Sequence, residues 1–112
     1  MKQNLTIEQS ATLIARGISA EKASAFDDIR TVIDGVQTFC PSTKTLFTLP
    51  DLLSLLPQAE RDLGGIMIDF DVERGKWAST YEFSDYMARE DELIDSLYKL
   101  ILHLLDNHVK LD

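Results

Sequence analysis

The pattern of apolar positions predicts two short helices at the start of the chain. Apolar residues recur there at helical spacing: Ile7, Ala11, Ile14 and Ile18. Thr6 and Gln9 have the spacing of a capping box, with Thr6 as the N-cap. Gly17 can adopt the left-handed conformation that ends a helix, and Ser19 can cap the next one. Residues 6–24 are therefore predicted to form a helix, a tight turn and a short second helix.

Residues 26–40 are compatible with two structures. A helical stripe would contain Phe26, Ile29, Ile33, Val36 and Cys40. However, Asp34-Gly35 lies between two runs rich in β-branched residues, 29–33 and 36–39, which is a strong hairpin signal. A helix would carry Gly35 in its interior at a cost of about 1 kcal/mol. The sequence thus favours a hairpin at about 29–39, with a helix as the alternative, followed by a surface loop at 40–45.

A third short helix is predicted over residues 48–57. Thr48 and Asp51 can cap its start, Pro50 is tolerated in the first turn, and Pro57 ends it. Its apolar side consists of Leu49, Leu52, Leu53 and Leu56. A helix of this length needs a docking surface to persist.

The clearest strand pattern is a hairpin over residues 66–83. In its first strand Ile66, Ile68, Phe70 and Val72 alternate with Met67, Asp69, Asp71 and Glu73. Arg74-Gly75 supplies the turn, and the second strand alternates in the same way. The pattern predicts that Trp77, Tyr81 and Phe83 face the core, while Asp69, Asp71 and Glu73 face outward.

From about residue 89 to residue 109 the chain is predicted to form one long amphipathic helix. Its apolar band contains Leu93, Leu97, Leu100, Ile101 and Leu104, and it is widened by Ile94, Tyr98, Leu102 and Leu105. The apolar arc covers roughly half of the helix surface, whereas a helix on one sheet needs only ~100°. The N-terminal helices or a second copy of the protein must cover the excess. We expect self-association in a homodimer through Ile94, Tyr98, Leu102 and Leu105.

These elements predict a single α+β domain spanning residues 1–112. N-terminal helices and the C-terminal helix cover a small antiparallel sheet, formed by the hairpin at about 66–83 and by the second hairpin at about 29–39. The hydrophobic share of 45% in 112 residues is typical of a folded domain. No apolar run approaches the ~20 residues of a membrane span. The first ten residues do not resemble a signal peptide, and the single Cys40 fits a reducing cytoplasm.

The charge balance argues against direct binding to nucleic acid. Eleven basic residues against 19 acidic ones give a net charge of −8, whereas nucleic-acid backbone requires a basic footprint. The acids expected on the surface are Asp69, Asp71, Glu73, Glu82, Asp85, Glu90 and Asp91. They are interpreted first as a solvated surface, stabilised in part by a helix N-terminus. The alternative is an acidic surface that imitates a phosphate backbone.

No catalytic, cofactor or metal site is predicted. Asp69 and Asp71 have the spacing of a carboxylate pair that binds hard cations, but alternate outward residues of a strand have the same spacing. His103 and His108 are five apart, which separates them by roughly 140° on a helix and prevents a shared metal. Cys40 has no evident base to activate it.

Several segments carry a resemblance to a known group of proteins. These are LTIEQSATLIARGISAEKAS, FTLPDLLSLLP, the aromatic hairpin and ELIDSLYKLILHLLDN, in this order. The chain resembles a widespread group of small uncharacterised proteins encoded by gut anaerobes and by their prophages and phages. Residues 25–45 match the group least. The resemblance implies an α+β fold and a genomic context, and it implies no activity.

The sequence therefore predicts a non-enzymatic interaction protein of mobile-element origin with a protein partner. One alternative is an acidic inhibitor that occupies a nucleic-acid-binding surface of a host or phage protein. Another is an enzyme that uses a divalent metal at Asp69 and Asp71, for which the carboxylates would have to converge in a pocket.

Overall fold

The computed structural model describes residues 2–27, 30–33, 36–39, 44–57, 59–60 and 62–111. Its helices are α1 (Ile7–Ala15), the one-turn 3-10 helix η1 (Ala20–Lys22), α2 (Leu49–Leu55) and α3 (Leu93–Asp106). Its strands are β1 (Ala25–Asp27), β2 (Arg30–Ile33), β3 (Val36–Phe39), β4 (Lys44–Leu46), β5 (Ala59–Glu60), β6 (Gly64–Asp71), β7 (Lys76–Tyr81) and β8 (Met87–Glu90).

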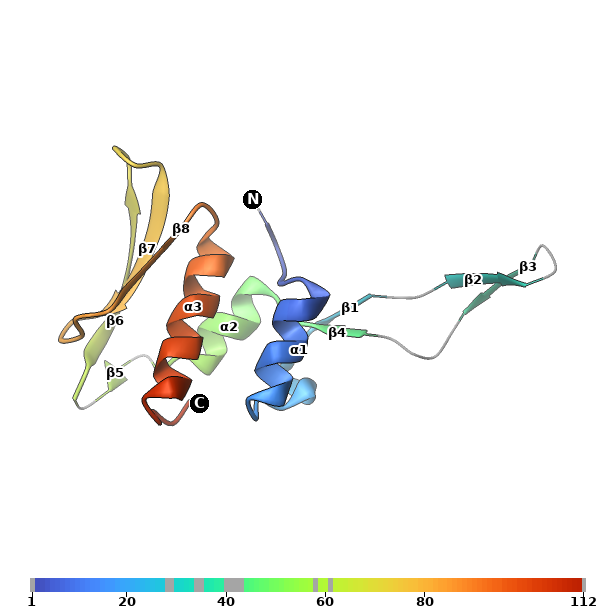
Figure 1. Ribbon diagram of the computed structural model, residues 1–112, viewed down its shortest axis with the longest axis horizontal. Coiled ribbons are helices and arrows are strands. Elements are labelled where there is room, and N and C mark those ends of the chain that lie inside the picture. Colours follow the sequence, from blue (N-terminus) through green and yellow to red (C-terminus); the bar gives the residue numbers. More distant parts are fainter. Residues whose placement is uncertain are drawn as a thin grey trace.

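The fold is α+β, as predicted, and α3 lies at its centre. Strands β5, β6, β7 and β8 form an antiparallel sheet in that order. One face of α3 packs on β7 and β8, and α2 lies against another part of the helix (Figure 1). Helix α1 lies further from the sheet, beside the β1–β4 pair (Figure 1).

The start of the chain has the predicted helix, turn and second helix. The Thr6–Gln9 capping box is formed in both directions. Gly17 has φ 102°, and the Ile18 amide donates to the Leu13 carbonyl at 3.0 Å, which closes α1 in a Schellman motif. Ser19 caps η1, so the second helix is a single 3-10 turn.

The second hairpin is present, but it stands apart from the main sheet. β2 pairs with β3 in the register Ile33↔Val36, and Asp34-Gly35 itself lies outside the described residues. β1 pairs with β4, and this two-stranded ribbon leads from α1 toward β2 and β3 (Figure 1). The predicted loop at 40–45 was wrong for Lys44 and Thr45, which belong to β4 because β1 provides a pairing partner. Residues 40–43 are outside the described part.

Helix α2 is capped as predicted, and Asp51 joins two segments there. Thr48 and Asp51 form a capping box, and Pro50 lies in the first turn. Asp51 also accepts the Ser24 amide at 2.8 Å and the Ser24 hydroxyl at 2.5 Å. Asp51 thus ties the segment after η1 to the start of α2.

A β-bulge at Gly64 begins the β6–β7 hairpin. The Glu82 amide donates to Gly65 O at 3.0 Å and the Phe83 amide to Leu63 O at 2.9 Å, so Gly64 is an extra residue between the two bonds. Gly64 has φ 75°, and a Cβ there would lie 2.9 Å from Glu82 Cβ. Only glycine fits this position without strain.

We therefore expect Gly64→Ala to lower the free energy of unfolding by about 2 kcal/mol, from the left-handed backbone and the steric contact together. Gly17 provides the matched control, because a Cβ there meets nothing within 4 Å although φ is also positive. Chemical denaturation should show a larger loss for Gly64→Ala than for Gly17→Ala. Equal losses would mean that the contact at the bulge is unimportant.

The predicted orientation of the hairpin is confirmed for most positions. Tyr81 is buried and Trp77 is half-buried, whereas Asp69 and Glu73 are exposed and Asp71 is half-buried on the outward face. Phe83 was predicted to face the core and is 68% exposed. The reason is that β7 ends at Tyr81, so the period-two alternation stops before residue 83 and the Phe83 ring lies beside Gly64.

The turn of the hairpin is longer than predicted. The strands end at Asp71 and Lys76, which pair with each other, and residues 72–75 form the turn with Gly75 at φ 64°. Val72 therefore lies in the turn and is 82% exposed.

The last helix begins later than predicted because the preceding residues form a strand. Met87–Glu90 is β8, which pairs with β7 in the register Ala78↔Arg89, and α3 begins at Leu93. The helix buries Ile94, Ser96, Leu97, Leu100, Ile101 and Leu104. Small residues bring it close to the sheet, since the Ser96 hydroxyl donates to Ala88 O at 2.7 Å and lies 2.7 Å from the Ser79 hydroxyl.

His108 closes α3 in the left-handed conformation that favours glycine. Its φ is 58°, and the Val109 amide donates to Leu104 O at 2.9 Å, the long-range bond of a Schellman motif.

We expect His108→Gly to raise the free energy of unfolding by about 0.5–1 kcal/mol, because glycine removes the backbone penalty. His108→Val is the control and should destabilise, since a β-branched residue is disfavoured there. Thermal unfolding of both variants measures the difference, and a less stable glycine variant would contradict it.

Candidate functional site: the exposed edge of the β6–β7 hairpin

Large exposed apolar side chains are concentrated around the β6–β7 hairpin. Eight such side chains occur in the described part of the chain, and six of them lie on or beside this sheet: Met67, Ile68, Phe70, Val72, Phe83 and Met87. The other two are Ile14 and Leu53, on separate helices. An exposed apolar patch of this kind is typical of an interaction surface.

The face of the sheet that carries α3 is only partly covered by this helix. Ile66, Ile68 and Phe70 share that face with Trp77 and Tyr81, because paired residues lie on the same side. The helix packs mainly on β7 and β8, and the far end of the hairpin extends beyond it (Figure 1). As a result Ile68 is 38% exposed and Phe70 is 41% exposed, with the Phe70 ring centroid 5.1 Å from that of Trp77.

One long edge of strand β6 lacks a pairing partner in the described part of the chain. β5 pairs with Gly64 and Gly65 only, and no other described strand pairs with Ile66–Asp71 on that side. The bond from the Glu82 amide to Gly65 O shows that Gly65 directs its backbone polar groups toward β7. Because these directions alternate along a strand, Ile66, Ile68 and Phe70 direct their N–H and C=O groups to the open edge.

The outward face of the sheet mixes acidic, basic and apolar side chains. Met67 and Asp69 on β6 lie in rows with Met87 and Arg89 on β8, and Asp71 lies opposite Lys76 on β7. An open hollow of about 420 Å³ is lined there by residues that include Asp69, Asp71, Glu73, Met87 and Arg89. The carboxylates on this face do not form an uninterrupted acidic surface.

Several of the predicted surface acids have basic partners. Lys76 Nζ lies 2.6 Å from Asp91 Oδ1, and Arg74 Nε lies 3.7 Å from Asp71 Oδ2. Lys99 pairs with Glu90, and the hydrogen bond that the Lys99 ammonium donates to this carboxylate raises the pKa of Lys99. Glu82 and Asp85 are exposed beside the hairpin base. Glu90 pairs with Trp77 and lies on the face that carries α3, so the seven acids do not share one face of the sheet, and three of them have cationic partners.

The candidate metal ligands of the described part do not form a metal site. Asp69 and Asp71 lie on the same face, but Asp71 accepts a hydrogen bond from the Arg74 amide and forms an ion pair with the Arg74 guanidinium. Among the described residues, no group of three or more His, Cys, Asp or Glu side chains is arranged to hold a metal ion. The His103 ring stacks on Tyr86 with centroids 3.9 Å apart, whereas His108 is exposed. Cys40 lies outside the described part.

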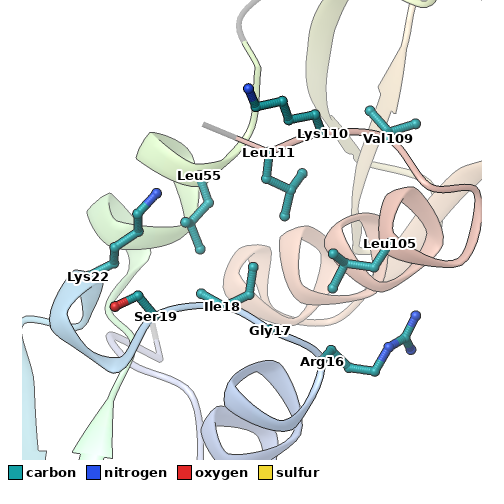
Figure 2. A pocket seen from close by; sticks show the side chains of 10 residues that line it. All are labelled: Arg16, Gly17, Ile18, Ser19, Lys22, Leu55, Leu105, Val109, Lys110 and Leu111. Carbon is teal, nitrogen blue, oxygen red and sulfur yellow. The ribbon is translucent and has the colours of Figure 1, made fainter.

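A second hollow lies at the other end of the molecule, between the α1–η1 turn and the C-terminal segment. Its volume is about 400 Å³, and Figure 2 shows an apolar floor with basic side chains around it. The floor contains Ile18, Leu55, Leu105, Val109 and Leu111, and the basic residues are Arg16, Lys22 and Lys110. Arg16 is ion-paired with Asp106 at 2.6 Å, which reduces its attraction for an anionic ligand.

The residues predicted to mediate self-association through α3 are largely covered within the chain. Ile94 is fully buried, so its predicted place in an exposed patch was wrong. Tyr98, Leu102 and Leu105 are half-buried and pack against the core cluster. Helix α2, which packs against α3, thus supplies part of the second cover.

Comparison of the chain with protein-family models, with curated proteins and with solved structures found no match. Among the helices of the described part, none has the length and hydropathy needed to cross a bilayer.

Proposed function

We propose that this chain is a non-enzymatic protein that binds another polypeptide along the open edge of β6. The resemblance noted above leads us to propose a phage or prophage origin as well. The edge offers the hydrogen-bonding groups of Ile66, Ile68 and Phe70, and the side chains beside it are apolar. An extended segment that adds to such an edge gains main-chain hydrogen bonds and buries these side chains.

One observation supports this proposal above all: exposed apolar side chains of β6 lie beside backbone groups with which no described strand pairs. Among these groups the Phe70 amide donates to Asp69 Oδ1 at 2.9 Å. Proteins usually protect such edges with charges, prolines or a covering element, because uncovered edges pair with other chains. In β6 the acidic residues Asp69 and Asp71 point to the outward face, and the face toward α3 remains apolar. This combination favours recognition of a strand with matching apolar residues.

Imitation of nucleic acid has less support. A phosphate-like surface requires a regular row of unpaired carboxylates. Here Arg74, Lys76 and Lys99 pair with three of the acids, and Arg89 lies on the same face as Asp69. The mixed charge favours a polypeptide partner.

A comparison of matched variants tests the proposed edge. Phe70 and Leu53 are both 41% exposed, but Phe70 lies at the β6 edge and Leu53 lies on α2. Wild type, Phe70→Lys and Leu53→Lys would be used as baits in lysate of the native host, with quantitative mass spectrometry. We expect a polypeptide that wild type and Leu53→Lys capture equally and that Phe70→Lys loses at least about tenfold, which corresponds to 1.4 kcal/mol. Equal capture by all three baits would contradict the proposal.

A further inference from the structure

We infer that the second hollow, between the α1–η1 turn and the C-terminal segment, binds a small anionic amphiphile, a free carboxylate with a medium-length alkyl chain. The site is separate from the β6 edge, so the inference does not depend on the proposed function. Three parts of the chain form its walls: residues 16–22, Leu55 of α2 and residues 105–111 (Figure 2). Its volume of about 400 Å³ lies within the range of small-molecule sites, about 300–1,000 Å³.

The floor of the hollow is aliphatic and only partly covered. Ile18 and Leu55 are buried members of the core cluster, whereas Leu105, Val109 and Leu111 pack against this cluster and remain half-buried. An alkyl chain lying on the half-buried side chains would remove their exposed parts from water. The described lining contains no aromatic side chain, so it offers a linear chain an apolar surface and a flat ring no stacking partner.

The charge around the hollow has the opposite sign to that of the whole chain. Three of its ten described lining residues are basic and none is acidic, although the chain contains 19 acidic residues against 11 basic ones. Figure 2 shows the three cationic side chains around the margin and the aliphatic side chains between them. This arrangement attracts an anionic group to the margin of an apolar floor and disfavours a cationic one.

Lys110 is the cation best placed to bind the carboxylate. Arg16 already pairs with Asp106 at 2.6 Å, whereas Lys110 is exposed and forms no ion pair within the described residues. The chain neighbours of Lys110, Val109 and Leu111, belong to the floor. A carboxylate at the Lys110 ammonium therefore has apolar surface beside it for the attached alkyl chain, and Lys22 adds positive charge at the same margin.

Titration of the ¹⁵N-labelled full chain with octanoate, followed by NMR, tests the inference. We expect the largest amide shifts at residues 16–19 and 109–111, and binding of hexanoate about tenfold weaker, because it buries two methylene groups fewer. Octylammonium is the matched ligand of opposite charge. A protein of net charge −8 attracts this cation in general, so a preference for octanoate has to come from the hollow. Equal binding of the two ligands, or no shift with octanoate, would overturn the inference.

Charge-reversed variants locate the site. Lys110→Glu should weaken octanoate binding at least about fivefold, since it replaces an attraction with a repulsion. Lys76→Glu changes the net charge equally but lies on β7, outside the hollow, and should bind octanoate like the wild type. Equal weakening in both variants, or shifts confined to β6, would overturn the inference. Shifts at residues 109–111 that depend on protein concentration without octanoate would show that a second copy covers the hollow, which would also overturn it.

Discussion

Leu100→Ala should lower the free energy of unfolding by about 3–4 kcal/mol, the cost of removing a large apolar side chain from a well-packed core. Leu100 is fully buried on α3, the helix that packs on the sheet and also against α2. Urea denaturation followed by circular dichroism provides the measurement. The control is Leu53→Ala on α2, which should cost less than about 1 kcal/mol because Leu53 is 41% exposed. Similar losses for the two variants would mean that α3 is not the centre of the core.

Asp51→Ala should have the second largest effect, a loss of about 3 kcal/mol at neutral pH. The carboxylate accepts hydrogen bonds from the Ser24 amide, the Ser24 hydroxyl and the Thr48 amide, at 2.8, 2.5 and 2.9 Å. Alanine would leave these donors without their acceptor and would remove the cap of α2. The matched control is Ser54→Ala, since the Ser54 hydroxyl is exposed and bonds only within its own helix.

The contribution of Asp51 to the free energy of unfolding should also depend on pH. Burial raises the pKa of Asp51, but the hydrogen bonds from Ser24 and Thr48 outweigh it, so the pKa lies below 3.8. A lowered pKa contributes stability above about pH 4, and this stability is lost as the pH falls through the folded-state pKa. The difference in unfolding free energy between wild type and Asp51→Ala should therefore shrink in acid. A difference that stays constant down to pH 2 would contradict the assigned hydrogen bonds.

Local sequence signals predicted the elements whose stabilising contacts are local. The two capping boxes depend on residues three apart, Thr6 with Gln9 and Thr48 with Asp51, and both are formed. The alternation over 66–71 also placed Asp69 on the outward face, because a strand period is visible within one segment.

The elements that depend on distant partners were the ones missed. Met87–Glu90 has the composition of a helix and becomes strand β8 because β7 offers an edge to pair with. The second hairpin was predicted, but its separation from the main sheet depends on tertiary contacts that its own residues do not specify.

The candidate site was predicted only in part for the same reason. Alternation identified the faces of β6, including the outward position of Asp69. The exposure of Ile68 and Phe70 follows from where α3 packs, and the open edge follows from the shortness of β5. The ion pairs of Asp71, Glu90 and Asp91 likewise form between residues on different elements or across a turn. Neither an apolar pattern nor a charge count contains this information.

Amide hydrogen exchange along β6 tests most directly the claim that this edge is free in the monomer and used in binding. In the protein alone the amides of Met67 and Asp69, which face β7, should exchange slowly, whereas those of Ile66 and Ile68 should exchange fast. When the polypeptide whose capture depends on Phe70 is added, the amides of Ile66 and Ile68 should become protected, and those of Met67 and Asp69 should change little. Protection of Ile68 in the protein alone, or fast exchange of Ile68 in the presence of that polypeptide, would contradict the claim.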